Sequence, residues 1–204
     1  MWDDAHAKRQ LHAYSQTRTS FAQEVNDVIP KQSTILELGC GEGNDSTYFA
    51  DQGHIVTATD FSERVVSSNS QNLTRSGLQF QVLDISKPFE YPGSSFDVIY
   101  ARLSLHYFTN DDTQKIFNEI ARVLVSGGYV CFMCKSVDDA LYGQGLQIEA
   151  DMFELNGHVR HFFNEDYVRQ LLVDNGFKID LLEKGREKLY ERESAFIKVI
   201  AQKK

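Results

Sequence analysis

The stretch ILELGCGEGNDS, residues Ile35–Ser46, places three glycines at every second position directly after a short apolar run. The apolar run predicts a buried β-strand that stops at the first glycine, and the polar residues after the third glycine predict a helix start. Glycine lets the main chain turn sharply and lets a ligand lie against it. The helix N-terminus adds unpaired N–H donors and partial positive charge. We therefore expect a ligand at this turn.

Strand-like and helix-like segments alternate along most of the chain. The predicted strands are residues 34–38, 54–60, 78–84, 95–101, 129–135, 177–184 and 195–204, and the predicted helices are residues 19–29, 44–53, 62–77, 110–128 and 164–176. This alternation predicts an α/β, Rossmann-like doubly wound fold with a seven-stranded, mostly parallel sheet. The last two strands are joined by a polar segment too short for a crossover helix, so we expect an antiparallel hairpin at one edge.

The chain is long enough for one domain with a substantial core, and we expect residues 1–204 to form a single domain. Two segments fall outside the alternation. Residues 1–30 are predicted to form an N-terminal helical lid, in which Trp2 and Tyr14 either fold over a ligand or serve the scaffold. Residues 136–163 form a long insertion, and long loops in compact α/β domains commonly act as lids or binding loops.

Composition narrows the range of partners. The net charge of −8 disfavours nucleic acid and anionic membranes, because both attract basic surfaces. No apolar run approaches the roughly 20 residues that span a bilayer, and the polar start MWDDAHAKRQ is unlike a secretory signal. Three cysteines are an odd number, so a disulfide framework is not expected. These features predict a cytoplasmic protein and leave its oligomeric state open.

Two acids follow predicted strands, where ligands bind in open α/β sheets. Asp60 lies 23 positions after Glu37, a distance typical of an acid that accepts hydrogen bonds from ribose hydroxyls. Asp84 ends the next strand and is placed to accept from a purine amine. The alternative is that both acids only terminate strands, since turns favour aspartate. Together with the glycines, they predict a site for a ligand that contains adenosine.

The turn argues against phosphates in that ligand. A dinucleotide-binding turn reads G-x-G-x-x-G/A, whereas Asn44 stands at the third glycine position here, and no G-K-[ST] sequence is present. Glu37, Glu42 and Asp45 lie in or beside the turn, which contains no lysine or arginine. Acids repel a pyrophosphate but suit a ligand that carries an ammonium and a sulfonium.

The sequence ELGCGEG resembles the E/D-x-G-x-G-x-G motif of class I S-adenosylmethionine-dependent methyltransferases. The acids in TATDFS and VLDI, then FDVIYARLSLHYF, a helix and SGG, resemble the rest of that family's core over about residues 33–135. GEGNDSTYFADQGHIVTATDFS is similar to the tellurite-resistance-type branch of small-molecule methyltransferases. The resemblance implies S-adenosylmethionine as methyl donor and a small molecule as methyl acceptor.

The resemblance also implies roles for individual residues. The glycines would lie against the methionine moiety, an acid and a main-chain carbonyl would hold its ammonium group, and the strand-end residues would bind ribose and adenine. The implied cofactor-binding residues are Glu37, Gly39, Gly41, Gly43, Asp60, Phe61, Asp84, Ile85 and Ala101.

His106 and Tyr107 are the candidate catalytic residues, because the family places residues just after the fourth strand against the transferring methyl group. His106 would be the general base for a phenol or carboxylate acceptor, whereas a thiolate or selenolate needs none. Local packing or hydrogen bonding is the alternative for His106, and covering the core is the alternative for Tyr107. The sequence does not identify the acceptor.

Two further patterns favour structural roles. Cys131 and Cys134 have C-x-x-C spacing, but residues three apart on a strand point to opposite faces, so we expect both to pack in the core. His158 and His161 lie near acids without the spacing of a metal site, so we expect a pocket wall and no metal.

The predicted function is methyl transfer by in-line displacement, which requires alignment of acceptor, methyl carbon and sulfur. Residues 1–30 and 136–163 are expected to build the acceptor pocket. Two alternatives stay open. One is a nicotinamide-dependent oxidoreductase, which Asn44 and the acidic turn disfavour, and the other is a catalytically silent regulatory module that binds S-adenosylmethionine.

Overall fold

A computed structural model describes residues 18–189 and 192–204. The chain divides into two compact units, one up to Ile85 and one from Ser86 onward. Trp2, Tyr14 and most of the predicted lid over residues 1–30 lie outside the described residues. Within the described part of the chain, no helix is long and apolar enough to cross a membrane.

The main sheet has seven strands in the order β3-β2-β1-β4-β5-β10-β9. The pairs β1/β2, β2/β3 and β4/β5 are parallel, whereas β10 is antiparallel to both β5 and β9. The predicted fold class is therefore confirmed, including the antiparallel edge hairpin. The strands of this sheet are β1 (Thr34–Leu38), β2 (Ile55–Asp60), β3 (Leu78–Val82), β4 (Phe96–Arg102), β5 (Leu124–Lys135), β9 (Phe177–Leu189) and β10 (Arg192–Lys203).

The first unit holds β1, β2 and β3 with three helices, α2 (Ser20–Val28), α3 (Asn44–Asp51) and α4 (Glu63–Asn72). Ile35, Leu36 and Leu38 of β1 are fully buried in its core, as expected for a central parallel strand. The α4 helix has its N-cap at Ser62, where the predicted range 62–77 begins, but it ends before Gly77, contrary to that prediction. The residues after Asn72 instead form a turn into β3, in which Leu78 N–H donates to Arg75 C=O.

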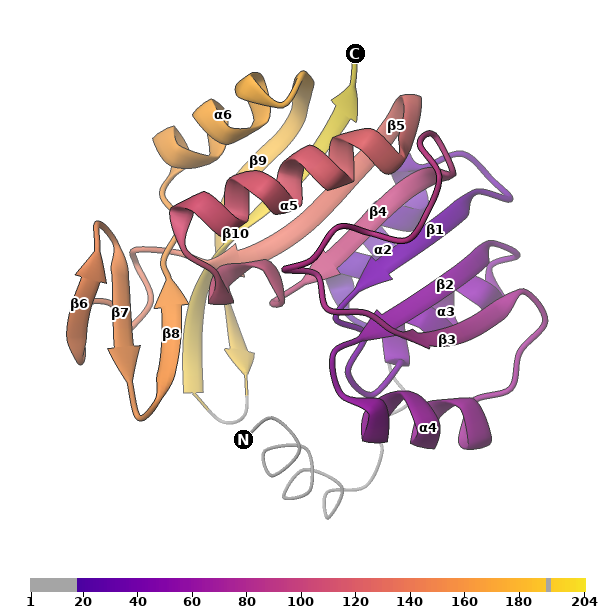
Figure 1. Ribbon diagram of the computed structural model, residues 1–204, viewed down its shortest axis with the longest axis horizontal. Coiled ribbons are helices and arrows are strands. Elements are labelled where there is room, and N and C mark those ends of the chain that lie inside the picture. The colour runs from indigo at the N-terminus through magenta and orange to yellow at the C-terminus, as the bar shows by residue number, and fades with distance from the viewer. Residues whose placement is uncertain (1–17, 190–191) are drawn as a thin grey trace. The chain divides into compact units, whose positions relative to one another are not determined.

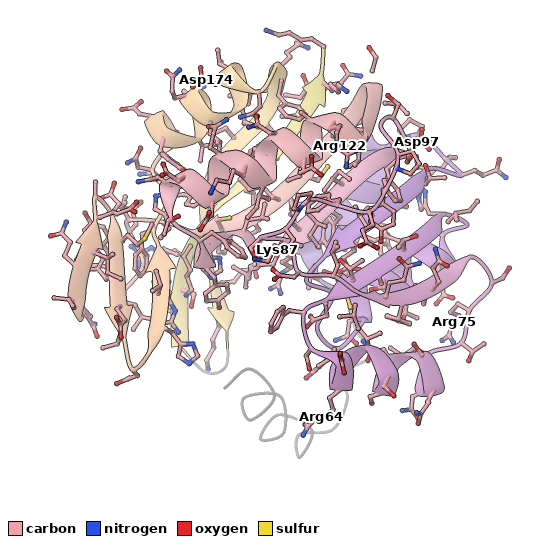
Figure 2. The ribbon with its side chains drawn as sticks, viewed as in Figure 1. Arg64, Arg75, Lys87, Asp97, Arg122 and Asp174 are labelled. Atoms are coloured by element: carbon pink, nitrogen blue, oxygen red, sulfur yellow. The ribbon has the colours of Figure 1, made fainter. Side chains whose placement is uncertain are left out.

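The second unit packs α5 (Asn110–Val123) along β5, as Figure 1 shows, and carries α6 (Glu165–Asp174) beside β9. The α5 helix ends where Arg122 (Figure 2) donates to the carbonyls of Phe89 and Tyr91 while pairing with Glu119. These bonds fix the segment that leads into β4. The β9/β10 hairpin is longer than predicted, because the polar residues between the two apolar segments continue the strand pairing up to Leu189 and Arg192.

The insertion over residues 136–163 is mostly a second sheet rather than a structureless loop. Its strands β6 (Leu146–Glu149), β7 (Met152–Leu155) and β8 (His158–His161) form an antiparallel meander (Figure 1). Met152, Phe153 and Phe162 are buried, so the insertion contributes its own apolar layer to the second unit. The two ends of the insertion are also joined, since the N–H of Phe163, its last residue, donates over 2.8 Å to the C=O of Lys135, the residue just before it.

The position of Gly145 allows a test of this sheet. A Cβ at Gly145 would lie 2.1 Å from the Glu154 carbonyl oxygen, whereas one at Gly143 would meet nothing within 4 Å, and both glycines have positive φ. We expect Gly145→Ala to lower amide protection across β6 and β7 roughly tenfold more than Gly143→Ala, because only the first adds a clash to the backbone strain. Hydrogen exchange measures this, and equal protection in the two variants would contradict the description.

Candidate functional site

The glycine turn after β1 has a fixed backbone conformation. Gly39, Gly41 and Gly43 have φ values of 84°, 52° and 74°, which side chains larger than glycine rarely adopt. The amides of Gly39 and Cys40 both donate to the Thr59 carbonyl, over 2.9 and 2.7 Å. These bonds tie the turn to the end of β2.

The peptide groups on either side of Gly41 are held by two side chains. Gly41 N–H donates to Asp60 Oδ2 over 3.0 Å, and its C=O accepts from Asn69 Nδ2 over 2.8 Å. The second oxygen of Asp60 accepts from Ser62 N–H over 3.0 Å. Each carboxylate oxygen has a further lone-pair site, so Asp60 can still accept from a ligand hydroxyl.

Asn69 is a site residue that the sequence interpretation missed. It is buried, on the same face of α4 as Val65 and Val66. A buried asparagine on an apolar helix face needs hydrogen-bond partners, since an unpaired amide would cost about 1–3 kcal/mol. The signal was therefore present as one polar residue at an apolar position of the helical pattern.

Two of the three acids near the turn bond to the protein. Glu37 is 3% exposed and accepts a hydrogen bond from the Ser46 hydroxyl. Asp45 is buried and accepts from both the amide and the hydroxyl of Thr19, which caps α2. Only Glu42 is exposed. The acids thus fix the turn and its first helix while keeping negative charge beside the glycines.

The remaining predicted residues of the first unit lie at the ends of β2 and β3. Asp60 pairs with Val82 across the two strands, and the Leu83 amide donates to the Asp60 carbonyl over 3.0 Å. Asp84 and Ile85 follow at once and are half-buried. Phe61 is 63% exposed, which is unusual for a phenylalanine and leaves its ring face free for a planar group. The structure therefore brings the glycine turn and these strand ends together.

In the second unit, Ala101 is buried within β4, and His106 and Tyr107 lie in a short 3-10 helix, η1 (Leu105–Tyr107). The imidazole of His106 is 1% exposed and its centroid lies 4.3 Å from that of Tyr107. His106 Nδ1 has no hydrogen-bond partner among the described residues. The sequence did not indicate this degree of burial.

Burial makes His106 a weak base. Desolvation, helped by Lys135, Arg160 and His161, lowers the pKa of His106 to about 3. General bases work best when their pKa lies near the operating pH. The geometry and electrostatics therefore favour a neutral imidazole that exchanges hydrogen bonds over one that removes a proton.

His161, on β8, has a similar environment. It is 2% exposed, its Nδ1 is also without a partner in the described part of the chain, and its ring lies 4.5 Å from that of Tyr167. Burial lowers the pKa of His161 to about 4, against the opposing effect of Asp151 and Glu149. Burial likewise raises the pKa of Tyr167 to about 12.

The cysteines of the C-x-x-C pattern pack in the core as expected. Cys131 and Cys134 are fully buried free thiols, and burial raises the pKa of each. Within residues 18–189 and 192–204, no group of three metal-ligating side chains comes together.

Part of the chain matches a known protein family. Residues 36–132 match a family described as a methyltransferase domain. Phosphoethanolamine N-methyltransferase 3 of Arabidopsis thaliana is 28% identical over 102 residues, which cover 49% of this chain and 21% of that protein. The chain thus spans about a fifth of the length of this curated relative.

Two solved structures share the fold. A S-adenosylmethionine-dependent methyltransferase from Methanosarcina mazei has 22% identity and a TM-score of 0.77, with 92% of this chain and 98% of that one covered. The 1,6-didemethyltoxoflavin-N1-methyltransferase of Burkholderia thailandensis, solved with 1,6-didemethyltoxoflavin and S-adenosylhomocysteine, has 20% identity and a TM-score of 0.73 over 97% of this chain and 83% of that one. The chain thus has the fold of class I S-adenosylmethionine-dependent methyltransferases, and its residues 36–132 match the methyltransferase-domain family.

The two buried histidines predict how stability depends on pH. Their folded-state pKa values of about 3 and about 4 lie below the ordinary 6.5, so the unfolded chain binds more protons between these limits. The stability that the two neutral imidazoles contribute is fully present above pH 6.5, and it is lost as the pH falls from 6.5 toward their folded-state pKa values of about 3 and about 4. Between pH 7.5 and 5, each imidazole should lower the free energy of unfolding by about 2 kcal/mol.

Urea unfolding at the two pH values measures this dependence. His106→Asn and His161→Asn should each reduce the pH-dependent loss, while His158→Asn, whose imidazole is partly exposed on the same strand as His161, should retain it. A loss of the same size in all three variants would show that other groups control the acid sensitivity.

Proposed function

We propose that this chain transfers a methyl group from S-adenosylmethionine to a small-molecule acceptor, in a single catalytic domain. The observation that carries the proposal is the glycine turn, whose Gly41 peptides are held between Asp60 and Asn69 in a conformation that leaves the main chain open to a ligand. The family match supports the same chemistry. The phosphoethanolamine and toxoflavin relatives, by their names, methylate small molecules, which supports that class of acceptor.

The residues of the first unit fit the cofactor. The bare turn suits the methionine chain, the negative charge of Glu37 and Glu42 suits a ligand bearing ammonium and sulfonium groups, and the exposed Phe61 ring suits adenine. Asp60 has lone pairs left for the ribose diol. We assign Asp84 and Ile85 to the adenine edge and face, and the Ala101 carbonyl to the ammonium group, following the family's pattern.

S-adenosylmethionine supplies an activated methyl group on a sulfonium. The protein's task is to position the acceptor in line with that methyl carbon and to exclude water from the site. We assign His106 and Tyr107 to the acceptor side. Because His106 is a weak base, we propose that it orients the acceptor through hydrogen bonds, and that the acceptor is ionised or a soft nucleophile when it binds.

We further propose that the protein acts in the cytoplasm, without nucleic acid or membrane as substrate, since its net charge is −8. An oxidoreductase would bind NAD, and a silent module would bind the sulfur ligands without turnover. Calorimetry with S-adenosylmethionine, S-adenosylhomocysteine and NAD distinguishes the proposed methyltransferase from an oxidoreductase. Release of S-adenosylhomocysteine in the presence of a panel of acceptors distinguishes it from a silent module.

Asp60→Asn tests the ribose assignment. We expect the wild type to bind S-adenosylhomocysteine at least about tenfold, or about 1.4 kcal/mol, more tightly than its 2′,3′-dideoxy analogue, because only the diol donates to Asp60. Calorimetry should show that preference shrinking in Asp60→Asn. Asp51→Asn, a surface acid of the same unit paired with Arg75, is the matched control and should keep the preference.

The paired ligands also separate recognition from turn geometry. A variant that only distorts the glycine turn would weaken both ligands equally and leave their ratio unchanged. That result, or a wild type that does not distinguish the two ligands, would remove Asp60 from ribose binding.

A further inference from the structure

Polar atoms without partners gather around two histidines of the second unit. His106 comes from η1 and His161 from β8, two elements that pack together. Both rings are almost completely buried, and neither Nδ1 has a hydrogen-bond partner among the described residues. Buried polar groups in folded proteins are nearly always paired. Two unpaired imidazole nitrogens at one place therefore call for a polar group that residues 18–189 and 192–204 do not supply.

The surroundings of this imidazole pair, His106 and His161, are aromatic. The ring of His161 lies 4.5 Å from Tyr167 and 4.7 Å from Phe163, and these two rings are 5.0 Å apart. The Thr113 hydroxyl lies beside the Tyr167 phenol without a hydrogen bond of ordinary geometry. A ligand here would thus meet hydrogen-bonding nitrogens next to an apolar, ring-lined wall.

The charged neighbours differ in what they can still bind. Lys135 and Arg160 lie on the His106 side, and Lys135 is occupied by Asp139 and Ser194. The main chain of Arg160 pairs with Phe153 in β7, but its guanidinium makes no hydrogen bond or ion pair with the residues that the structure describes. Within that set, it is the cation with free donors near the imidazole pair.

The acids on the His161 side already have donors. Glu149 accepts from the amide and side chain of Asn110, over 3.2 and 2.7 Å. Asp151 accepts from the Tyr142 hydroxyl over 2.6 Å and from Asn164 over 2.9 Å. Their charge remains, but their oxygens are held by the protein. The unmet hydrogen-bonding capacity of the cluster therefore lies with a guanidinium and with two imidazole Nδ1 atoms, each of which donates in the tautomer that carries its proton there.

We propose that the imidazole pair, together with Arg160, binds a carboxylate of the methyl acceptor, whose apolar or aromatic body packs against Phe163 and Tyr167. The proposal rests on the proposed function, because it takes the ligand to be the acceptor. A carboxylate offers two oxygens with several lone pairs, which matches donors that come from separate elements. Charge-assisted hydrogen bonds to a carboxylate also exceed those to a neutral amide in strength.

Three aromatic probes of similar size test this inference: benzoate, benzamide and benzylamine, titrated into the protein saturated with S-adenosylhomocysteine. We expect benzoate to bind at least tenfold more tightly than benzamide, and benzylamine not to bind. Arg160→Gln should remove most of the preference for benzoate over benzamide. Arg169→Gln, the same change at an exposed position of α6, is the matched control and should leave it intact.

His161→Gln and His106→Gln should each weaken benzoate binding at least fivefold. Arg160→Gln keeps the test decisive if a histidine variant fails to fold, because Arg160 is only partly buried. Preferred binding of benzylamine, equal binding of benzoate and benzamide, or no binding of benzoate would overturn the inference. The preliminary titration with S-adenosylhomocysteine separates failure of this inference from failure of the proposed function. If S-adenosylhomocysteine itself does not bind, the proposed function is wrong.

Discussion

The two hydrogen bonds at Gly41 are the constraint on which the first unit depends. Asp60 accepts from the Gly41 amide and Asn69 donates to its carbonyl, so β2 and α4 together fix a turn that three glycines alone would leave flexible. Glycine is needed because each position has positive φ, and the freedom that glycine brings must be removed again by specific bonds. The result is a fixed main-chain turn that carries no side chain at every second position, which is what close approach of a ligand requires.

In the second unit, burial rather than hydrogen bonding sets the properties of the candidate residues. His106 and His161 lie in an aromatic environment that keeps both imidazoles neutral at physiological pH. A neutral imidazole offers one donor and one acceptor, and it does not repel a cationic cofactor as an imidazolium would. This arrangement fits a reaction in which the acceptor is oriented more than it is deprotonated.

Much of the fold followed from local patterns. The alternation of apolar strands with helices predicted the order and type of the main-sheet elements. The helices predicted to begin at Ser62 and Asn164 do have those residues as N-caps, because capping is a short-range effect. The insertion over residues 136–163 was not recognised as a sheet, since its strands are four residues long and partly exposed. Its pairing depends on positive-φ turns such as those at Asp151 and Asn156, which composition does not specify.

The sequence by itself determined that the glycines, Asp60 and Asp84 gather at one edge of the sheet, because they stand at strand ends whose alignment a parallel sheet imposes. Only the tertiary structure decided the chemistry available to His106. Its basicity depends on how deeply its ring is buried, and on Lys135, Arg160 and His161, which are distant in the sequence. The same holds for Asn69, whose partner at Gly41 lies 28 residues away. Local pattern fixes where residues stand along strands and helices, whereas desolvation and long-range hydrogen bonds arise only when those elements pack.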